Sequence, residues 1–319
     1  MSFPISDHCD GTRFFNPHAR QDKTLRELLR WLVLERAEPW PASVALPAVA
    51  PPPVEVSAGT VAVTFVNHCT FLLQWAGVRV LTDPIFSSRA SPVRWAGPRR
   101  VMPPGVAPED LPRVDVVVVS HNHYDHLDAA SLRWILRRDR PVVITPLGNA
   151  RLLRSLGAED IVERDWWEHW EHGALRVCVV PAQHWSNRLG VPRNTALWAG
   201  FWLEADAQSV YFAADSGYGP HFAEIRRRCG TPDVSLLPIG AYEPRWFMRD
   251  QHMNPADAVQ AHEDLGSRLS IASHFGTFRL TNEGHSAPVR ALHEALEARP
   301  GLTTEFRVLT QGETITTLR

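Results

Sequence analysis

Three histidines and an aspartate lie within six residues near the middle of the chain. The segment reads His121-Asn122-His123-Tyr124-Asp125-His126, and it follows directly on the apolar run 114–119. Imidazole nitrogens and carboxylate oxygens together suit a borderline-soft divalent ion such as zinc. His121 and His123 share one side of an extended segment, whereas Asp125 and His126 come after a bend. Because one ion cannot easily use all four groups of so short a loop, we expect two metal ions side by side.

Three more side chains that can bind a metal follow other strand-like runs. His184 comes after the run 175–180, Asp215 after 209–213 and His274 after 269–272. Side chains just past strand ends gather where a sheet presents its loops at one edge. We therefore expect all three to join the central cluster.

The seven side chains divide into two ligand sets that share one aspartate. The ligands assigned to the first ion are His121, His123 and His184. Those assigned to the second ion are Asp125, His126 and His274. Asp215 is expected to bridge the two ions.

The pattern H-x-H-x-D-H, followed by a distal His, Asp and His, resembles that of metallo-β-lactamase-fold hydrolases. Several further blocks look like the N-acyl-phosphatidylethanolamine-hydrolysing phospholipase D group. These blocks span residues 10–17, 82–86, 97–100, 183–186, 241–248 and 274–278. The resemblance implies an α/β (α+β) fold: an αβ/βα four-layer sandwich of two facing mixed β-sheets flanked by helices. It also implies two zinc ions per chain at the edge of the sheets.

The same resemblance implies a reaction. A hydroxide that bridges the two zinc ions would attack the phosphorus of a phosphodiester, because paired metals lower the pKa of a bound water. The products would be N-acylethanolamine and phosphatidic acid. Asp125 and Asp215 would be catalytic as well as metal-binding, and Tyr124 and His252 would contact the substrate near the phosphate. Asp128 is expected to hydrogen-bond a ligand histidine, whereas His68, His285 and Asp83 could line the site rim or simply pack.

Other functions compete with this one. A different hydrolase on the same scaffold, acting on a soluble phosphodiester, a lactone or a thioester, needs only the metal site. An apolar groove formed by the helix at 24–34 and a tryptophan-rich lip would favour acyl chains; a narrow polar mouth would not. A third possibility is a metal-binding scaffold or sensor without catalytic activity. A missing ligand would favour this role, but the sequence supplies all seven candidate ligands and therefore disfavours it.

The surrounding elements follow from hydrophobic periodicity. Apolar runs predict strands at 61–65, 71–75, 78–82, 114–119, 141–145, 175–180, 196–203, 209–213, 234–237, 269–272 and 306–309. Helical spacing predicts helices at 129–138, 150–156, 255–265 and 288–298. Residues 1–56 are expected to form an N-terminal extension, with an amphipathic helix after the capping box Thr24–Glu27 and a proline-rich strap at 38–54. Residues 57–319 are expected to form the catalytic domain.

Composition limits the partners. The 33 basic and 35 acidic residues give a formal charge of −2, which removes most support for nucleic-acid binding. The chain shows neither a signal peptide nor an apolar run long enough to span a membrane, so we expect a cytoplasmic protein. The amphipathic helix and 12 tryptophans suit peripheral contact with a phospholipid membrane. Members of the resembled group often dimerise, which makes a second copy of this chain a candidate partner.

Overall fold

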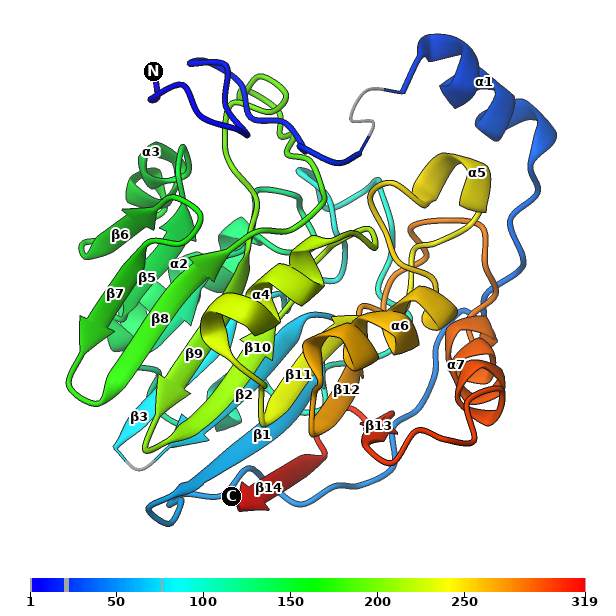
Figure 1. Ribbon diagram of the computed structural model, residues 1–319. Coiled ribbons are helices and arrows are strands. Elements are labelled where there is room, and N and C mark those ends of the chain that lie inside the picture. Colours follow the sequence, from blue (N-terminus) through cyan, green and yellow to red (C-terminus); the bar gives the residue numbers. More distant parts are fainter. Residues whose placement is uncertain (1, 20–22, 76, 319) are drawn as a thin grey trace.

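The computed structural model describes residues 2–19, 23–75 and 77–318. Two seven-stranded sheets face each other at its centre (Figure 1). The strands of the first sheet, in spatial order, are β14 (Thr314–Leu318), β1 (Thr60–Asn67), β2 (Thr70–Trp75), β3 (Val78–Thr82), β4 (Val116–Val118), β5 (Val142–Pro146) and β6 (Ile161–Arg164). Those of the second are β13 (Glu305–Arg307), β12 (Leu269–Ser273), β11 (Val234–Pro238), β10 (Gln208–Phe212), β9 (Gly200–Ala205), β8 (Leu175–Val180) and β7 (His169–His172).

The two sheets repeat one pairing scheme. In the first sheet the three pairings from β14 to β3 are antiparallel, and those from β3 to β6 are parallel. In the second sheet the pairings from β7 to β10 are antiparallel and those from β10 to β13 are parallel. Both sheets are therefore mixed, as the sequence resemblance implied.

The core lies between the sheets because successive side chains of a strand point to opposite faces. On β2, Phe71 and Leu73 enter the central core, whereas Leu72 points outward. On β11, Val234 and Leu236 point inward and Leu237 outward. Strands that are buried on both faces read as nearly continuous apolar runs, which explains why the sequence shows so little alternation.

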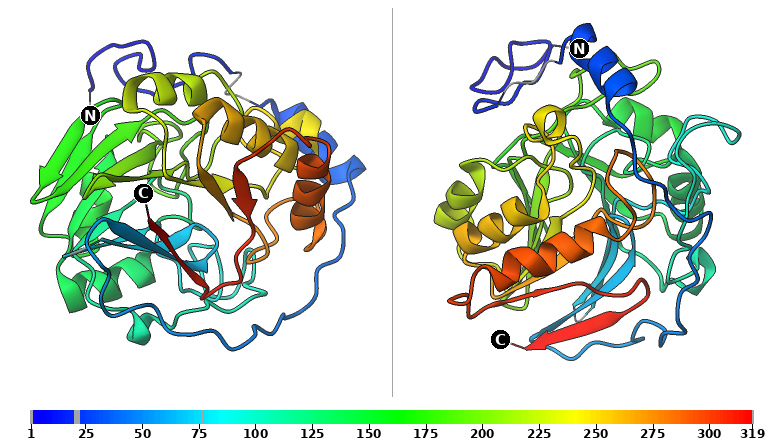
Figure 2. Two further views of the ribbon diagram at one scale, coloured as in Figure 1. Left: turned by 60° about the horizontal axis from the view of Figure 1, so that its bottom comes forward. Right: turned by 90° about the vertical axis from the view of Figure 1, so that its right-hand side faces the viewer.

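Helices cover both outer faces and complete the four layers (Figures 1 and 2). Helices α2 (Ala129–Asp139) and α3 (Ala150–Ser155) pack on the first sheet. Helices α4 (His221–Cys229), α6 (Pro255–Leu265) and α7 (Ala287–Glu297) pack on the second. A short 3-10 helix, Pro108–Asp110, and α5 (Arg245–Met248) lie in the connections. The predicted four-layer α/β sandwich is thus confirmed.

The N-terminal segment approaches the sheets from the loop side (Figure 1). Phe14 is buried in the central core, so the first residues contribute to the body of the molecule. Helix α1 (Leu25–Leu34) begins at the predicted capping box, and none of its residues is buried. Among the described residues, no helix combines the length and apolarity needed to cross a bilayer.

Candidate metal centre

Loops at the strand ends bring the seven predicted residues together. His121 follows β4, His184 follows β8, Asp215 follows β10 and His274 follows β12. The backbone of His274 takes a left-handed φ of 59°, and Ala214, next to Asp215, has a φ of 52°. Such conformations are unfavourable for residues with a side chain and are typical of functional sites.

The first set joins His121, His123, His184 and Asp215. One ligand-capable atom from each lies within 4.8 Å of the others. Nδ1 of His123 is 2.9 Å from Nε2 of His121 and 3.2 Å from Nε2 of His184. Nε2 of His184 is in turn 3.6 Å from Oδ2 of Asp215. Three imidazole nitrogens and one carboxylate oxygen therefore converge on one point.

The second set joins Asp125, His126 and His274, and it includes His68. Oδ2 of Asp125 is 3.6 Å from Nε2 of His126 and 3.4 Å from Nε2 of His274. Nε2 of His68 lies 3.1 Å from the same carboxylate oxygen. His68 is fully buried and follows β1, so its sequence context matched that of the ligands although the sequence alone did not decide its role.

Asp215 stands between the two sets. Its Oδ2 lies 3.2 Å from Nε2 of His126 and 4.0 Å from Nε2 of His121. Its Oδ1 lies 3.1 Å from Nε2 of His274. One carboxylate thus faces both predicted ion positions, which is the geometry that a bridging ligand requires.

The donor set fits divalent metal ions. Nε2 of His126, Nε2 of His274 and Oδ1 of Asp215 are buried without a hydrogen-bond partner, and buried polar atoms of this kind call for an explanation. Burial and neighbouring rings lower the pKa of His123 to about 3, and burial lowers that of His184 to about 4, although Asp215 opposes the shift. Neutral imidazoles keep a lone pair that can coordinate a metal.

The carboxylates of the cluster are ionised. Burial alone would raise the pKa of Asp125 and Asp215, but His126 and His274 hold both pKa values well below the ordinary range. In the reverse direction, burial alone would lower the pKa of His274, but Asp215 and Asp125 raise it to about 9. A positive charge is therefore favoured at the point where these carboxylates meet.

Comparison with known proteins assigns the family. A model of the β-lactamase superfamily domain matches residues 78–275, which contain the whole cluster except His68. This chain belongs to the metallo-β-lactamase superfamily.

Relatives of this metallo-β-lactamase-fold chain include a named lipid hydrolase. It is 36% identical to N-acyl-phosphatidylethanolamine-hydrolyzing phospholipase D 1 of Caenorhabditis elegans, over 78% of this chain and 74% of that protein. It is 40% identical to an uncharacterized protein of Mycobacterium tuberculosis, over 86% of this chain and 75% of the relative. The structure of an isothiocyanate hydrolase from Delia radicum gut bacteria has a similar fold, with a TM-score of 0.64 and 24% identity over 80% of this chain and 98% of that one.

A buried carboxylate that is not one of the seven predicted ligands orients two histidines of this metallo-β-lactamase centre. Oδ2 of Asp83 accepts a hydrogen bond from Nδ1 of His126 at 2.7 Å. Asp83 also accepts hydrogen bonds from the hydroxyl and the backbone N–H of Ser120, and the Ser120 hydroxyl lies 2.9 Å from Nδ1 of His121. Carboxylates that orient metal-binding histidines in this way strengthen the site.

The predicted role of Asp128 is wrong. Its carboxylate accepts hydrogen bonds from Ser87 and from the backbone and hydroxyl of Ser131, so it caps helix α2. An aspartate at this position satisfies N–H groups that the first helical turn leaves unpaired. His285 also lies apart from the cluster: Nε2 of its ring is 3.1 Å from the Gly276 carbonyl oxygen, and the ring packs edge-on against Trp40.

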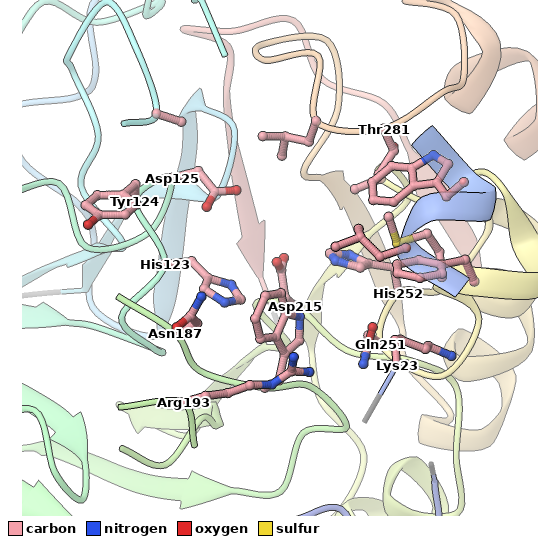
Figure 3. A pocket seen from close by; sticks show the side chains of 18 of the residues that line it. Lys23, His123, Tyr124, Asp125, Asn187, Arg193, Asp215, Gln251, His252 and Thr281 are labelled. Carbon is pink, nitrogen blue, oxygen red and sulfur yellow. The ribbon is translucent and has the colours of Figure 1, made fainter. Parts of the chain in front are cut away.

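A cavity of about 700 Å³ opens onto the centre (Figure 3). Asp125, Asp215 and His123 of the cluster line it, together with Tyr124 and His252. The predicted substrate-contacting residues are therefore beside the cluster. Apolar side chains form one part of the remaining lining: Leu25, Leu28, Trp31, Phe247, Met248 and Leu280. Polar and basic side chains form the rest: Lys23, Thr24, Asn187, Arg193, Gln251 and Thr281.

Proposed function

We propose that this protein is a dizinc phosphodiesterase of phospholipase D type that hydrolyses N-acyl-phosphatidylethanolamine to N-acylethanolamine and phosphatidic acid. The observation that carries the proposal is the cavity, because it joins the metal-ligating cluster to an apolar wall. Leu28 and Trp31 of α1 form part of this wall, together with Phe247. A volume of about 700 Å³ accommodates a phosphodiester head group with the beginning of its acyl chains.

The sequence resemblance and the relatives support the same chemistry. The named relative from C. elegans hydrolyses N-acyl-phosphatidylethanolamine according to its name, and the chain aligns with most of it. The apolar groove beside α1 is also the feature that separates lipid hydrolysis from hydrolysis of small polar esters. Two tryptophans, Trp31 and Trp185, line the cavity.

The cluster residues that line the cavity would have different roles in the reaction. Zinc bound by the two ligand sets would polarise a phosphoryl oxygen and make a coordinated water more acidic. Asp215 faces both sets and holds them at a fixed separation. It also supplies a carboxylate that can accept a hydrogen bond from the attacking water. Asp125 completes the second set, and His68 orients its carboxylate through the contact of 3.1 Å.

Tyr124 and His252 would hold the phosphate. The Tyr124 oxygen accepts a hydrogen bond from the Leu189 N–H at 3.2 Å, which leaves the phenolic O–H able to donate to substrate. Burial keeps the pKa of His252 well below its ordinary value, although Asp215 opposes the shift. A neutral imidazole carries one N–H, so His252 can donate one hydrogen bond to a phosphoryl or leaving-group oxygen.

Helix α1 is the proposed contact with the membrane that holds the substrate. Leu25, Leu29, Leu32 and Val33 are 70%, 51%, 66% and 75% exposed, although they form the apolar side of the helix. Because α1 also borders the cavity, a lipid that leaves the bilayer along this helix would reach the metal centre without crossing water. An amphipathic helix with basic residues suits a position at the lipid interface.

A substrate comparison tests the proposal. Zinc-loaded protein is incubated with N-acyl-phosphatidylethanolamine vesicles, a soluble phosphodiester, a lactone and a thioester. The proposal predicts the highest kcat/KM for the lipid. Turnover of the soluble phosphodiester alone would retain the dizinc chemistry and reject the lipid. Preferred turnover of the lactone or thioester would reject the phosphodiesterase.

A further inference from the structure

The N-terminal segment reaches the metal centre although it lies outside the matched superfamily domain, residues 78–275. Phe14 anchors this segment in the core, and its backbone N–H donates to the Asn194 carbonyl at 2.8 Å. Two residues beyond this anchor, the side chain of Asn16 meets the backbone of His184. A ligand of the first set is therefore in contact with a segment that the superfamily domain does not include.

Asn16 binds both backbone groups of His184. Its Nδ2 donates to the His184 carbonyl at 2.8 Å, and its Oδ1 accepts from the His184 N–H at 3.2 Å. The same Oδ1 accepts a hydrogen bond from Nε1 of Trp198 at 3.1 Å. Because Asn16 is 6% exposed, water cannot readily replace these bonds.

A second contact from the segment acts on the imidazole ring. Nζ of Lys23 pairs with Oδ2 of Asp250 at 2.7 Å, and the Lys23 side chain is 8% exposed. The Asp250 carbonyl accepts a hydrogen bond from Nε2 of Gln183 at 3.0 Å. The next carbonyl, that of Gln251, accepts from Nδ1 of His184 at 2.9 Å. Lys23 therefore anchors the turn that directs Nε2 of His184 toward the cluster (Figure 3 shows Lys23, Gln251 and Asp215).

We propose that Asn16 is a positioning residue for the first metal site, with Lys23 as its partner in this task. Asn16 fixes the His184 backbone, and the turn held by Lys23 fixes the ring. Outer contacts of this kind typically contribute roughly 10–100-fold to metal affinity. The inference rests on the metal centre of the proposed function but not on the identity of its substrate.

The test is zinc retention by full-length Asn16→Asp against a graded chelator. The substitution preserves size but removes both N–H donors and places a carboxylate against the His184 carbonyl. We expect one zinc equivalent to be lost at a chelator concentration roughly 10–100-fold lower than in the unmodified protein, with the other equivalent unchanged. His184→Ala identifies the first-site equivalent. His8→Gln is the matched control, because His8 ties the same segment to Asp165, away from the cluster.

Lys23→Met provides a second variant in case Asn16→Asp fails to fold. It should weaken the same zinc equivalent, and Lys23→Arg should restore its retention. Unchanged retention in a folded variant would overturn the inference. Equal loss of both equivalents, with the same fall in unfolding midpoint as in His8→Gln, would also overturn it, because the segment would then act only through stability.

Measurements on the unmodified protein distinguish failure of the proposed function from failure of the positioning role of Asn16 and Lys23. Protein that holds two zinc ions but leaves lipid phosphodiesters intact would contradict the proposed function alone. Protein that holds no zinc would contradict both.

Discussion

At the scale of single residues, the geometry of the centre depends on side chains that do not line the cavity. Asp83 is fully buried and joins His126 of the second set to His121 of the first, the latter through Ser120. One carboxylate thus orients histidines from both sets. Asp128 lies only two residues from His126 in sequence, yet it serves a helix terminus.

This contrast between the two aspartates can be tested. Asp83→Asn should lower zinc affinity and kcat roughly 10–100-fold, because the amide is a weaker acceptor for the N–H of His126. Asp128→Asn should leave zinc affinity unchanged. It should lower the free energy of unfolding by about 1 kcal/mol or less, because asparagine is also a good helix cap. Chelator competition and urea unfolding of both variants measure the two effects. Equal zinc affinities in the two variants would contradict the assignment.

Asp215→Asn tests the bridging position. The loss of a ligand shared by both sets should reduce turnover by more than the roughly 100-fold that a weakened outer contact costs. Both zinc equivalents should become easier to remove, whereas Asp125→Asn should affect mainly the second. Metal analysis accompanies the rate measurement, so that inactive protein is distinguished from metal-free protein. Loss of a single equivalent in Asp215→Asn would argue against bridging.

The ligand-like residues could be predicted from the sequence because residue type and strand context coincide in them. His121 to His126 form a dense cluster, and His184, Asp215 and His274 each follow an apolar run. The hydrogen bonds that orient these residues could not be predicted in this way, although Asp83 was a candidate for the rim of the site. Asp83 and Asn16 contact the histidines only through the tertiary fold, across 43 and 168 residues of sequence.

At the scale of elements, the proposed action on a membrane lipid depends on helix α1. Leu29→Glu combined with Leu32→Glu should weaken binding to phospholipid vesicles at least about tenfold, because burying one leucine contributes about 1.5–3 kcal/mol. Turnover of a soluble phosphodiester should remain unchanged, since both side chains are exposed and neither lines the cavity. Val54→Glu is the control, because Val54 is an even more exposed apolar residue and lies on the strap. Vesicle sedimentation gives the readout, and equal binding by all three proteins would reject the role of α1.

The N-terminal segment should give the protein a pH-dependent stability. Burial alone would lower the pKa of His8, but hydrogen bonds and charges from Asp165 and Asp7 raise it above the ordinary value of 6.5. A raised pKa means that the folded state holds the proton more tightly than the unfolded state. The contribution is therefore fully present below pH 6.5 and is lost as the pH rises through the folded pKa.

We predict that His8→Gln lowers the free energy of unfolding less at high pH than at low pH. In urea unfolding, the difference in stability between the unmodified protein and His8→Gln should be larger at pH 5.5 than at pH 8.5. Asp165→Asn should reduce the same difference, because it removes one of the two carboxylates that bind the His8 ring. A difference that grows toward high pH would contradict the sign of the shift.

Elements with clear caps or periodicity were predictable. Helix α6 has the predicted limits, because Asn254 caps it and Pro255 occupies its first turn. Strand β7, with the sequence His169-Trp170-Glu171-His172, was missed because this edge strand is largely exposed and has no apolar run. Helix α4 was missed because Arg226, Arg227 and Arg228 follow one another near its end and obscure its apolar face.

At the scale of the whole molecule, the two sheets share one arrangement of antiparallel and parallel pairings although no internal repeat is evident in the sequence. Burial on both faces requires only apolar side chains of suitable volume, so two halves can share a topology without sharing residues. The candidate ligands come from loops of both halves, with His121 after a strand of the first sheet and Asp215 after a strand of the second. The centre therefore requires both sheets to be in place.

The most direct test of the proposed function is to hydrolyse N-acyl-phosphatidylethanolamine in ¹⁸O-labelled water and analyse the products by mass spectrometry. Attack on phosphorus with loss of the N-acylethanolamine predicts one ¹⁸O in the phosphatidic acid and none in the released alcohol. Asp215→Asn should produce neither. Label in a released fatty acid, or in the N-acylethanolamine, would show that a different bond is cleaved and would contradict the proposed function.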